Sequence, residues 1–260
     1  MGEKDEREEA VEQKPDPGVF ITKGMQVSIP DFSLRIGPDG NIEAGPVNLH
    51  TGLDLCPYWL EIAYGHLLST EKASNDLLSA KDEQNDERIA EALQAEFTAG
   101  MQTIMVSAVA IDAYYASVKD CIKIPNEITR TWREKGTARY KQIAEVLRRA
   151  FPMPDQSAKQ LREILKEIMG FRDKAVHPSS RTTAPALHPE LNKVTDWRYA
   201  TFRYHNAKAI TRLTLSIIAQ TAALSHKVKF QALKTYCDTL SSRIEPFLKR
   251  WEARYGKLSG

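Results

Sequence analysis

The chain has 260 residues, of which 42% are hydrophobic and 27% are charged, and its formal net charge is +2. This composition is typical of a soluble globular protein whose apolar side chains fill one large core or two modest ones. No stretch approaches the roughly 18 consecutive apolar residues of a membrane-spanning helix. The cysteines Cys56, Cys121 and Cys237 are far apart and odd in number, so they form neither a disulfide framework nor a paired-cysteine metal site. We therefore expect a protein of the reducing cytoplasm that has no contact with a membrane.

The small net charge conceals an asymmetry along the chain. Residues 1–121 carry 9 basic and 22 acidic side chains, a net charge of −13, whereas residues 122–260 carry 27 and 12, a net charge of +15. Two explanations are open. Either the halves complement each other within one fold, or the basic half faces a polyanion while the acidic half faces solvent.

The first 50 residues divide into a tail and a β-rich segment. Residues 1–17 carry 7 acidic and 3 basic side chains, which predicts a disordered tail and is unlike the leader of a secreted protein. Residues 18–50 predict a small hairpin or meander that is too small to fold alone. Its strands are expected at residues 19–22, 25–29, 32–36 and 42–44, with a turn at Pro38-Asp39-Gly40-Asn41.

After Pro57 the apolar residues recur with the period of a helix. Residues 86–122 carry one continuous apolar stripe, which predicts a long helix. The stripe consists of Ile89, Leu93, Phe97, Met101, Ile104, Ala108, Ile111, Tyr115, Val118 and Ile122. A shorter helix is predicted over residues 58–78, joined to the long one by a polar link over residues 79–86.

Four more helices are predicted in the basic half. They cover residues 127–151, 156–176, about 196–225 and 230–255, with Asp155 capping the second, Thr195 or Asp196 capping the third, and Pro246 kinking or splitting the fourth. Pro178 ends the second of them near His177, and residues 179–190 are expected to form a loop. The predicted fold is mainly α, an up-and-down helical bundle over residues 51–260 with the β-rich segment 18–50 as an N-terminal decoration.

The motifs of most enzyme classes are absent from the sequence. The chain has no GxGxxG, no GxxxxGK[ST] and no GxSxG motif, and it has no HExxH, paired CxxC or Glu-x-x-His metal motif. We therefore expect neither a cofactor nor a metal site.

The segment GFRDKAVHPSS, residues 170–180, holds the strongest candidate for chemistry. Arg172 and His177 are five residues apart near the end of a predicted helix. The partial negative charge of a helix C-terminus favours protonated histidine and moves its pKa from about 6.5 toward neutrality, where it can act as general base or acid. Arg172 offers a permanently charged fork for a phosphate. The alternative is structural: Arg172 pairs with Asp173 or Asp112, and His177-Pro178 only stops a helix.

Spacing alone does not single out this pair, since Arg181/His188 and Arg198/His205 have similar spacings. Arg181/His188 spans Pro185 in a predicted loop, and Arg198/His205 falls in a helix rich in aromatic residues. In both contexts we interpret the histidine as a hydrogen-bonded or surface group.

The string from Arg172 to His177 resembles the Arg-polar-x3-His motif of HEPN domains, and residues 107–120 are similar to the second helix of such domains. The resemblance covers roughly residues 55–225. It implies an all-helical, metal-independent endoribonuclease, often a toxin or phage-defence effector, acting as a homodimer whose two motifs share one cleft. Arg172 and His177 would then be catalytic, with Asp173 orienting one of them, and an antitoxin is a possible partner. Such families also contain inactive members that bind nucleic acid or a partner protein.

Several further residues are candidates around this motif. Lys174 and Asp112 are supporting candidates, and Asp112 either contacts Arg172 or serves as a buried or interface hydrogen-bonding group, whereas Tyr115 is expected in the core. The candidate RNA-binding residues are Arg130, Arg133, Arg139, Arg148, Arg149 and Arg181. The rings of Trp132 and Tyr140 are candidates for stacking on RNA bases. The alternatives are a solvated helix face, core burial of at least one of the aromatic residues, or pairing of the basic residues with the acidic half.

Overall fold

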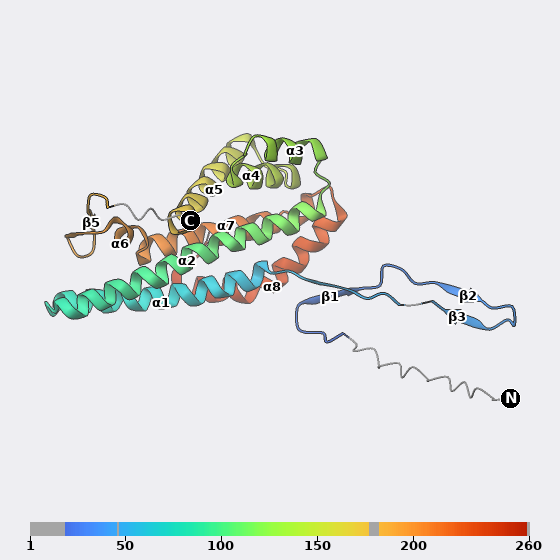
Figure 1. The fold of residues 1–260 in the computed structure, drawn as a ribbon, viewed down its shortest axis with the longest axis horizontal. Coiled ribbons are helices and arrows are strands. Elements are labelled where there is room, and N and C mark those ends of the chain that lie inside the picture. Colours follow the sequence, from blue (N-terminus) through green and yellow to red (C-terminus); the bar gives the residue numbers. More distant parts are fainter. Residues whose placement is uncertain (1–18, 46, 177–181, 259–260) are drawn as a thin grey trace, which may run out of the picture. The chain divides into compact units, whose positions relative to one another are not determined.

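The computed structural model describes residues 19–45, 47–176 and 182–258, and the chain divides into two compact units between Leu53 and Asp54 (Figure 1). The expected disordered tail, residues 1–17, lies outside the described residues. The predicted fold class is confirmed, because the second unit is a helical bundle and the first holds only short antiparallel strands.

The first unit contains two separate strand pairs. Strand β1 (Met25–Ser28) pairs with β4 (His50–Leu53), and β2 (Leu34–Ile36) pairs with β3 (Ile42–Ala44), both antiparallel. The predicted turn between β2 and β3 is confirmed, and Gly40 there has a φ of 80°, which glycine tolerates. The strand predicted over residues 19–22 is wrong, because that segment pairs with no strand among the described residues, and β4 was not predicted.

The second unit is built on two long antiparallel helices, α1 (Cys56–Asp82) and α2 (Asp86–Cys121). The long helix predicted over residues 86–122 is confirmed, and the side chain of Asn85 caps it by accepting a hydrogen bond from the Arg88 amide at 3.1 Å. Helix α1 extends further than predicted at both ends. Its apolar face continues through Leu77 and Ala80, which are buried, so the predicted link is mostly helical.

Residues 127–151, predicted as one helix, form two: α3 (Asn126–Glu134) and α4 (Arg139–Ala150). The prediction is wrong because Gly136 has a φ of 55°, which ends α3 and redirects the chain before α4 begins. Helix α5 (Asp155–Val176) agrees with its prediction, except that Asp155 is its first residue. Helices α4 and α5 pack on each other and on α2.

The segment predicted as a loop contains a small hairpin, β5 (Ala186–His188) with β6 (Lys193–Thr195). The next predicted helix is also divided in two, α6 (Trp197–Thr201) and α7 (Tyr204–Ala222), and Asp196 caps α6 as expected. The break depends on α2: Glu96 Oε1 accepts a hydrogen bond from the Tyr204 amide at 2.9 Å. At the same place α2 carries Gly100, and a Cβ there would lie 1.8 Å from the carbonyl oxygen of Phe202.

The chain ends in a 3-10 turn, η1 (Ser225–Lys227), and helix α8 (Gln231–Tyr255). Helix α8 runs through Pro246 as one helix, so the expected split does not occur. The larger of two hydrophobic clusters in the described residues joins α1, α2, α4, α5, α7 and α8, in agreement with the predicted bundle, and Tyr115 belongs to it. None of the helices in the described part of the chain is long and apolar enough to span a membrane.

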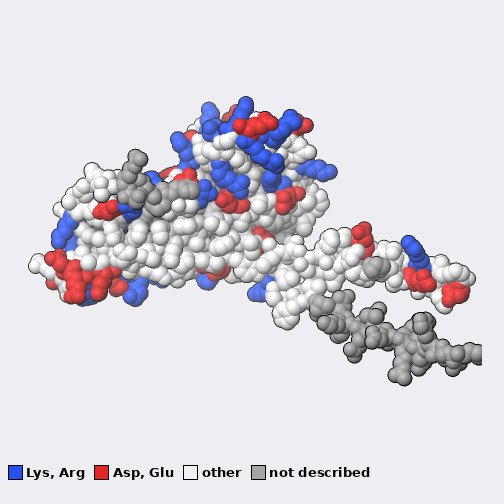
Figure 2. All heavy atoms as spheres, in the orientation of Figure 1, with Lys and Arg blue, Asp and Glu red and all other residues white. Residues whose placement is uncertain are grey.

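The charge asymmetry is visible on the surface of the bundle. Acidic side chains gather at the tip of the α1–α2 hairpin, and basic side chains gather over α3, α4 and α5 (Figure 2). Within the described residues, the ion pairs that join basic residues of 122–183 to the acidic half both end on one carboxylate, Asp112. The basic surface over α3, α4 and α5 therefore has little pairing with the acidic half. Further along the chain, Lys193, Arg243, Arg250 and Arg254 do pair with carboxylates of that half.

Candidate functional site

Arg172 lies near the C-terminal end of α5, where that helix packs on α2. Leu165, Ile168 and Met169 form the buried face of α5 and fix how the helix is rotated. This rotation brings Arg172 to Asp112 on α2, with 3.3 Å between Arg172 Nη1 and Asp112 Oδ2. Both side chains keep about a quarter of their surface exposed, 25% for Arg172 and 26% for Asp112, so solvent and a ligand can reach them.

Asp112 holds a second guanidinium at the same place. Arg139, the first residue of α4, donates from Nε to Asp112 Oδ1 at 2.7 Å. The same guanidinium lies over the ring of Tyr115, 4.2 Å from its centroid, a cation–π contact. Burial raises the pKa of Tyr115 above its usual value, while Arg139 acts in the opposite direction. One carboxylate therefore joins α2, α4 and α5 and sets two arginines side by side.

Asp173 and Lys174 complete the described part of the motif. Asp173 Oδ1 accepts hydrogen bonds from Arg172 Nε at 3.1 Å and from Nη2 at 2.7 Å. Lys174 Nζ lies 5.0 Å from the centre of the Phe171 ring. Arg172 is thus held from two sides by Asp112 and Asp173, and the structure contains both of the pairings that the structural alternative requires.

Two candidate residues, His177 and Arg181, lie outside the described residues. Helix α5 is described to Val176, the residue directly before His177.

The remaining candidate RNA-binding arginines are mostly engaged in ion pairs. Glu145 pairs with Arg148 at 3.0 Å and with Arg149 at 2.6 Å. Arg130 lies 3.7 Å from Glu134, whereas Arg133 is exposed and has no ion pair within the described residues. The aromatic candidates Trp132 and Tyr140 are partly buried against the core, which limits the ring surface they offer to bases.

The two alternative histidines differ from each other. His188 is fully buried, and within the described part of the chain neither ring nitrogen has a hydrogen bond, although Nδ1 lies 3.4 Å from Glu190 Oε2. His205 is exposed on α7, with Nδ1 3.1 Å from Glu190 Oε1. Arg198 pairs with Asp196 at 2.8 Å. His205 agrees with the interpretation as a surface group, whereas His188 is buried without a hydrogen bond, so that interpretation is wrong for it.

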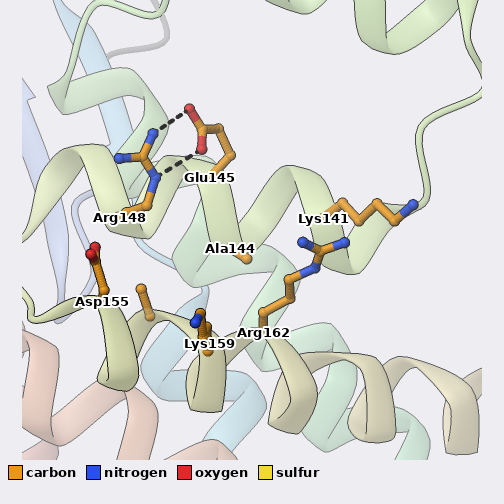
Figure 3. A pocket seen from close by; sticks show the side chains of 8 residues that line it. Lys141, Ala144, Glu145, Arg148, Asp155, Lys159 and Arg162 are labelled. Carbon is orange, nitrogen blue, oxygen red and sulfur yellow. Dashed lines mark hydrogen bonds and ion pairs between the residues drawn. The ribbon is translucent and has the colours of Figure 1, made fainter.

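A cationic groove lies between α4 and α5, with a volume of about 350 Å³ (Figure 3). We call it the α4–α5 groove. Its lining residues are Lys141, Ala144, Glu145, Arg148, Asp155, Ala158, Lys159 and Arg162. The sequence analysis did not single out Lys141 or Arg162, although Asp155, Lys159 and Arg162 recur at helical spacing along one face of α5.

Residues 19–45, 47–176 and 182–258 bring together no group of three or more His, Cys, Asp or Glu side chains able to hold a metal ion. No family model matches the chain, and comparisons with curated proteins and with solved structures find no match either.

Proposed function

We propose that the chain is a metal-independent endoribonuclease of the HEPN type in which Arg172 and His177 carry the reaction. One observation carries the proposal. Arg172, five residues before His177, is fixed by Asp112 and Asp173 near the end of a helix, while a quarter of its side chain stays exposed. Arg172 donates three of its five N–H groups to Asp112 and Asp173, and the two that remain can bind a phosphate without displacing either carboxylate.

The reaction is attack by a ribose 2′-OH on the adjacent phosphorus. A base takes the proton of the 2′-OH, an acid protonates the leaving 5′ oxygen, and a cation stabilises the charge that develops on the phosphorane. One chain supplies a single motif histidine, so a two-fold dimer brings the second. The products are a 2′,3′-cyclic phosphate and a 5′-hydroxyl, and DNA, which lacks the 2′-OH, is not cut.

The resemblance to HEPN domains also implies a cellular role. We include in the proposal a toxin or phage-defence role and a protein partner, such as an antitoxin, that restrains the enzyme.

A second function, a non-catalytic helical module that binds nucleic acid or a partner protein, is supported by the same contacts. Asp112 and Asp173 together balance the charges of Arg172 and Arg139. A guanidinium whose charge is balanced serves the packing of α2, α4 and α5 without any reaction. This function predicts salt-sensitive binding of RNA, or binding of a protein, without turnover.

The test compares wild type, His177→Ala and Arg172→Ala on total RNA and on DNA of matched sequence, in excess EDTA. Cleavage of RNA alone, lost in both variants while their circular dichroism spectra and melting temperatures stay close to those of wild type, supports the ribonuclease. Lys249→Ala is the control, because Lys249 is exposed on α8 and is not among the candidate site residues. Wild type that cuts no RNA but binds it favours the second function.

A further inference from the structure

We propose that the α4–α5 groove binds the phosphate backbone of an RNA strand and leads it to Arg172. The inference deepens the proposed function, on which the choice of RNA as the ligand rests.

The groove holds cations that no carboxylate balances. Its lining carries four basic side chains, Lys141, Arg148, Lys159 and Arg162, and two acidic ones, Glu145 and Asp155. Arg148 is bound to Glu145 by two hydrogen bonds of 3.0 Å. Lys141, Lys159 and Arg162 have no ion pair within the described residues, and Figure 3 shows Arg162 of α5 extending toward Lys141 of α4. Cations that line one groove repel each other, and a bound anion reduces that repulsion.

The shape of the groove suits a phosphate strand better than an enclosed ligand. Ala144 of α4 and Ala158 of α5 are its small lining residues, and they leave the hollow between the two helices. The long side chains of Lys159, Arg162 and Lys141 stand around that hollow, and two of them are flexible lysines that adapt to a backbone of variable path. A volume of about 350 Å³ is at the low end for a small-molecule pocket and is large enough for a phosphate and its sugar.

The position of the groove connects it with the candidate site. On α5, Asp173 lies eleven residues beyond Arg162, which is three helical turns, so the two residues share one face of the helix. Asp173 in turn holds Arg172. The separation along the axis is about 16 Å at 1.5 Å per residue, which roughly five nucleotides span at ~3.4 Å per stacked step. A strand lying in the groove therefore reaches Arg172 without leaving α5.

Several arginines that the sequence analysis named as RNA-binding candidates are weaker candidates for binding the phosphate backbone. Arg148 and Arg149 share Glu145, and Arg139 is bound to Asp112. A phosphate would have to compete with a carboxylate for each of them. Lys141, Lys159 and Arg162 offer their charge without such competition, so we assign them the larger part of the binding.

The test compares Lys159→Glu/Arg162→Glu with a control of equal charge change, Lys249→Glu/Lys257→Glu. Helix α8, which carries Lys249 and precedes Lys257, packs on α1, α2 and α7. The first probe is a fluorescein-labelled single-stranded 20-nucleotide RNA, which is titrated with proteins that also carry His177→Ala so that it is not cut. The second probe is the DNA of the same sequence, which is titrated with proteins in which His177 is intact. Anisotropy titrations run from 50 to 300 mM NaCl. In parallel, RNA cleavage is measured with the groove variant and the control variant in which His177 is intact.

We expect the groove variant to raise the Kd for both probes at least tenfold and to lower the slope of log K against log salt by about 1.4, since each lost phosphate contact removes about 0.7. The control should stay within twofold of the parent. KM for cleavage should rise with the Kd, while kcat at saturating RNA stays within threefold. Lys159→Ala/Arg162→Ala serves as the second variant, since it avoids the new negative charges if the first fails to fold.

Groove variants that are folded and bind both probes as the control does would overturn the inference, even if wild type cuts RNA. Binding of RNA and DNA that depends on the groove supports the inference, even if wild type cuts neither, in which case the proposed function alone fails. Equal loss of binding in the groove variant and the control means that net charge governs binding, and this outcome also overturns the inference.

Discussion

Asp112 on α2 and Arg172 on α5 are 60 residues apart in the chain and are joined by an ion pair of 3.3 Å. The same carboxylate accepts a hydrogen bond from Arg139 at 2.7 Å through its other oxygen. Two guanidiniums from two helices are therefore fixed relative to each other by one side chain of a third. In our account Asp112 is a positioning residue, because it acts on phosphate only through these arginines.

Replacing Asp112 by Asn should separate positioning from folding. Asp112→Asn keeps the shape of the side chain but weakens two ion pairs that are partly exposed, each of which contributes about 0.2–1 kcal/mol, so the free energy of unfolding should fall by about 0.4–2 kcal/mol. We expect kcat for RNA cleavage to fall at least tenfold while KM changes less than threefold. Asp120→Asn, an exposed carboxylate on the same helix, is the control for steady-state kinetics and urea unfolding. Unchanged kcat in Asp112→Asn would contradict the positioning role.

Gly100 should be the least replaceable glycine of the bundle. A Cβ at Gly100 would lie 1.8 Å from the carbonyl oxygen of Phe202, which is backbone and cannot turn aside, so Gly100→Ala should cost about 3 kcal/mol or more. Gly65 lies in α1 with no atom within 4 Å of its Cβ position, and Gly65→Ala should stabilise the chain by about 0.5–1 kcal/mol. Thermal melting of the two variants measures the difference. Equal melting temperatures would show that α2 and the α6–α7 break do not approach as described.

The helix breaks show what the sequence could and could not predict. The break after α3 has a local signal, Gly136, which adopts a positive φ. The break between α6 and α7 has none, because residues 197–222 contain neither glycine nor proline. It depends on Glu96 and Gly100, about a hundred positions earlier in the chain, which bind the Tyr204 amide and make room for Phe202. A contact of this kind follows from tertiary packing, and no periodicity reports it.

The candidate site was predictable only in part, as were the helix breaks. An acidic residue beside the apolar stripe made Asp112 a candidate for Arg172, and the structure brings the two together. The position of Arg139 beside them was not predicted, because it depends on α4 beginning at that residue, and the pattern predicted a continuous helix. Lys159 and Arg162 were indistinguishable from a solvated face, since the groove exists only where α4 packs beside α5.

His188 should make stability depend on pH. Burial lowers the pKa of His188 below its usual 6.5, with Glu190 opposing and Arg203 reinforcing the change. The unfolded chain then binds more protons than the folded chain as the pH falls through 6.5 toward the folded pKa, so stability should be lost over that range. His188→Leu removes the titration, and its melting temperature relative to wild type should rise steadily from pH 7.5 to pH 5. A constant difference across that range would contradict this expectation.

If two chains share one active site across a two-fold axis, mixing wild-type chains with inactive His177→Ala chains should lower the activity. Sedimentation equilibrium should give twice the mass of one chain. After co-refolding with a fourfold excess of His177→Ala, only about one fifth of wild-type chains find a wild-type partner, and activity per wild-type chain should fall to about that fraction. Mixing with the same excess of Lys249→Glu/Lys257→Glu, which keeps the motif intact, should leave the activity per total chain unchanged. Activity that is independent of the His177→Ala chain would show that each protomer works alone.

The chemical identity of the cut ends tests the central claim most directly. One oligonucleotide is cut by wild type in excess EDTA, the cut site is mapped, and the substrate is made again with a single 2′-deoxynucleotide on the 5′ side of that site. We predict 2′,3′-cyclic phosphate and 5′-hydroxyl ends on the first substrate and no cut at the mapped site on the second, because the attacking hydroxyl is gone. Ends with a 5′-phosphate, or a cut that survives the 2′-deoxy substitution, would contradict the assignment of Arg172 and His177 to 2′-OH attack.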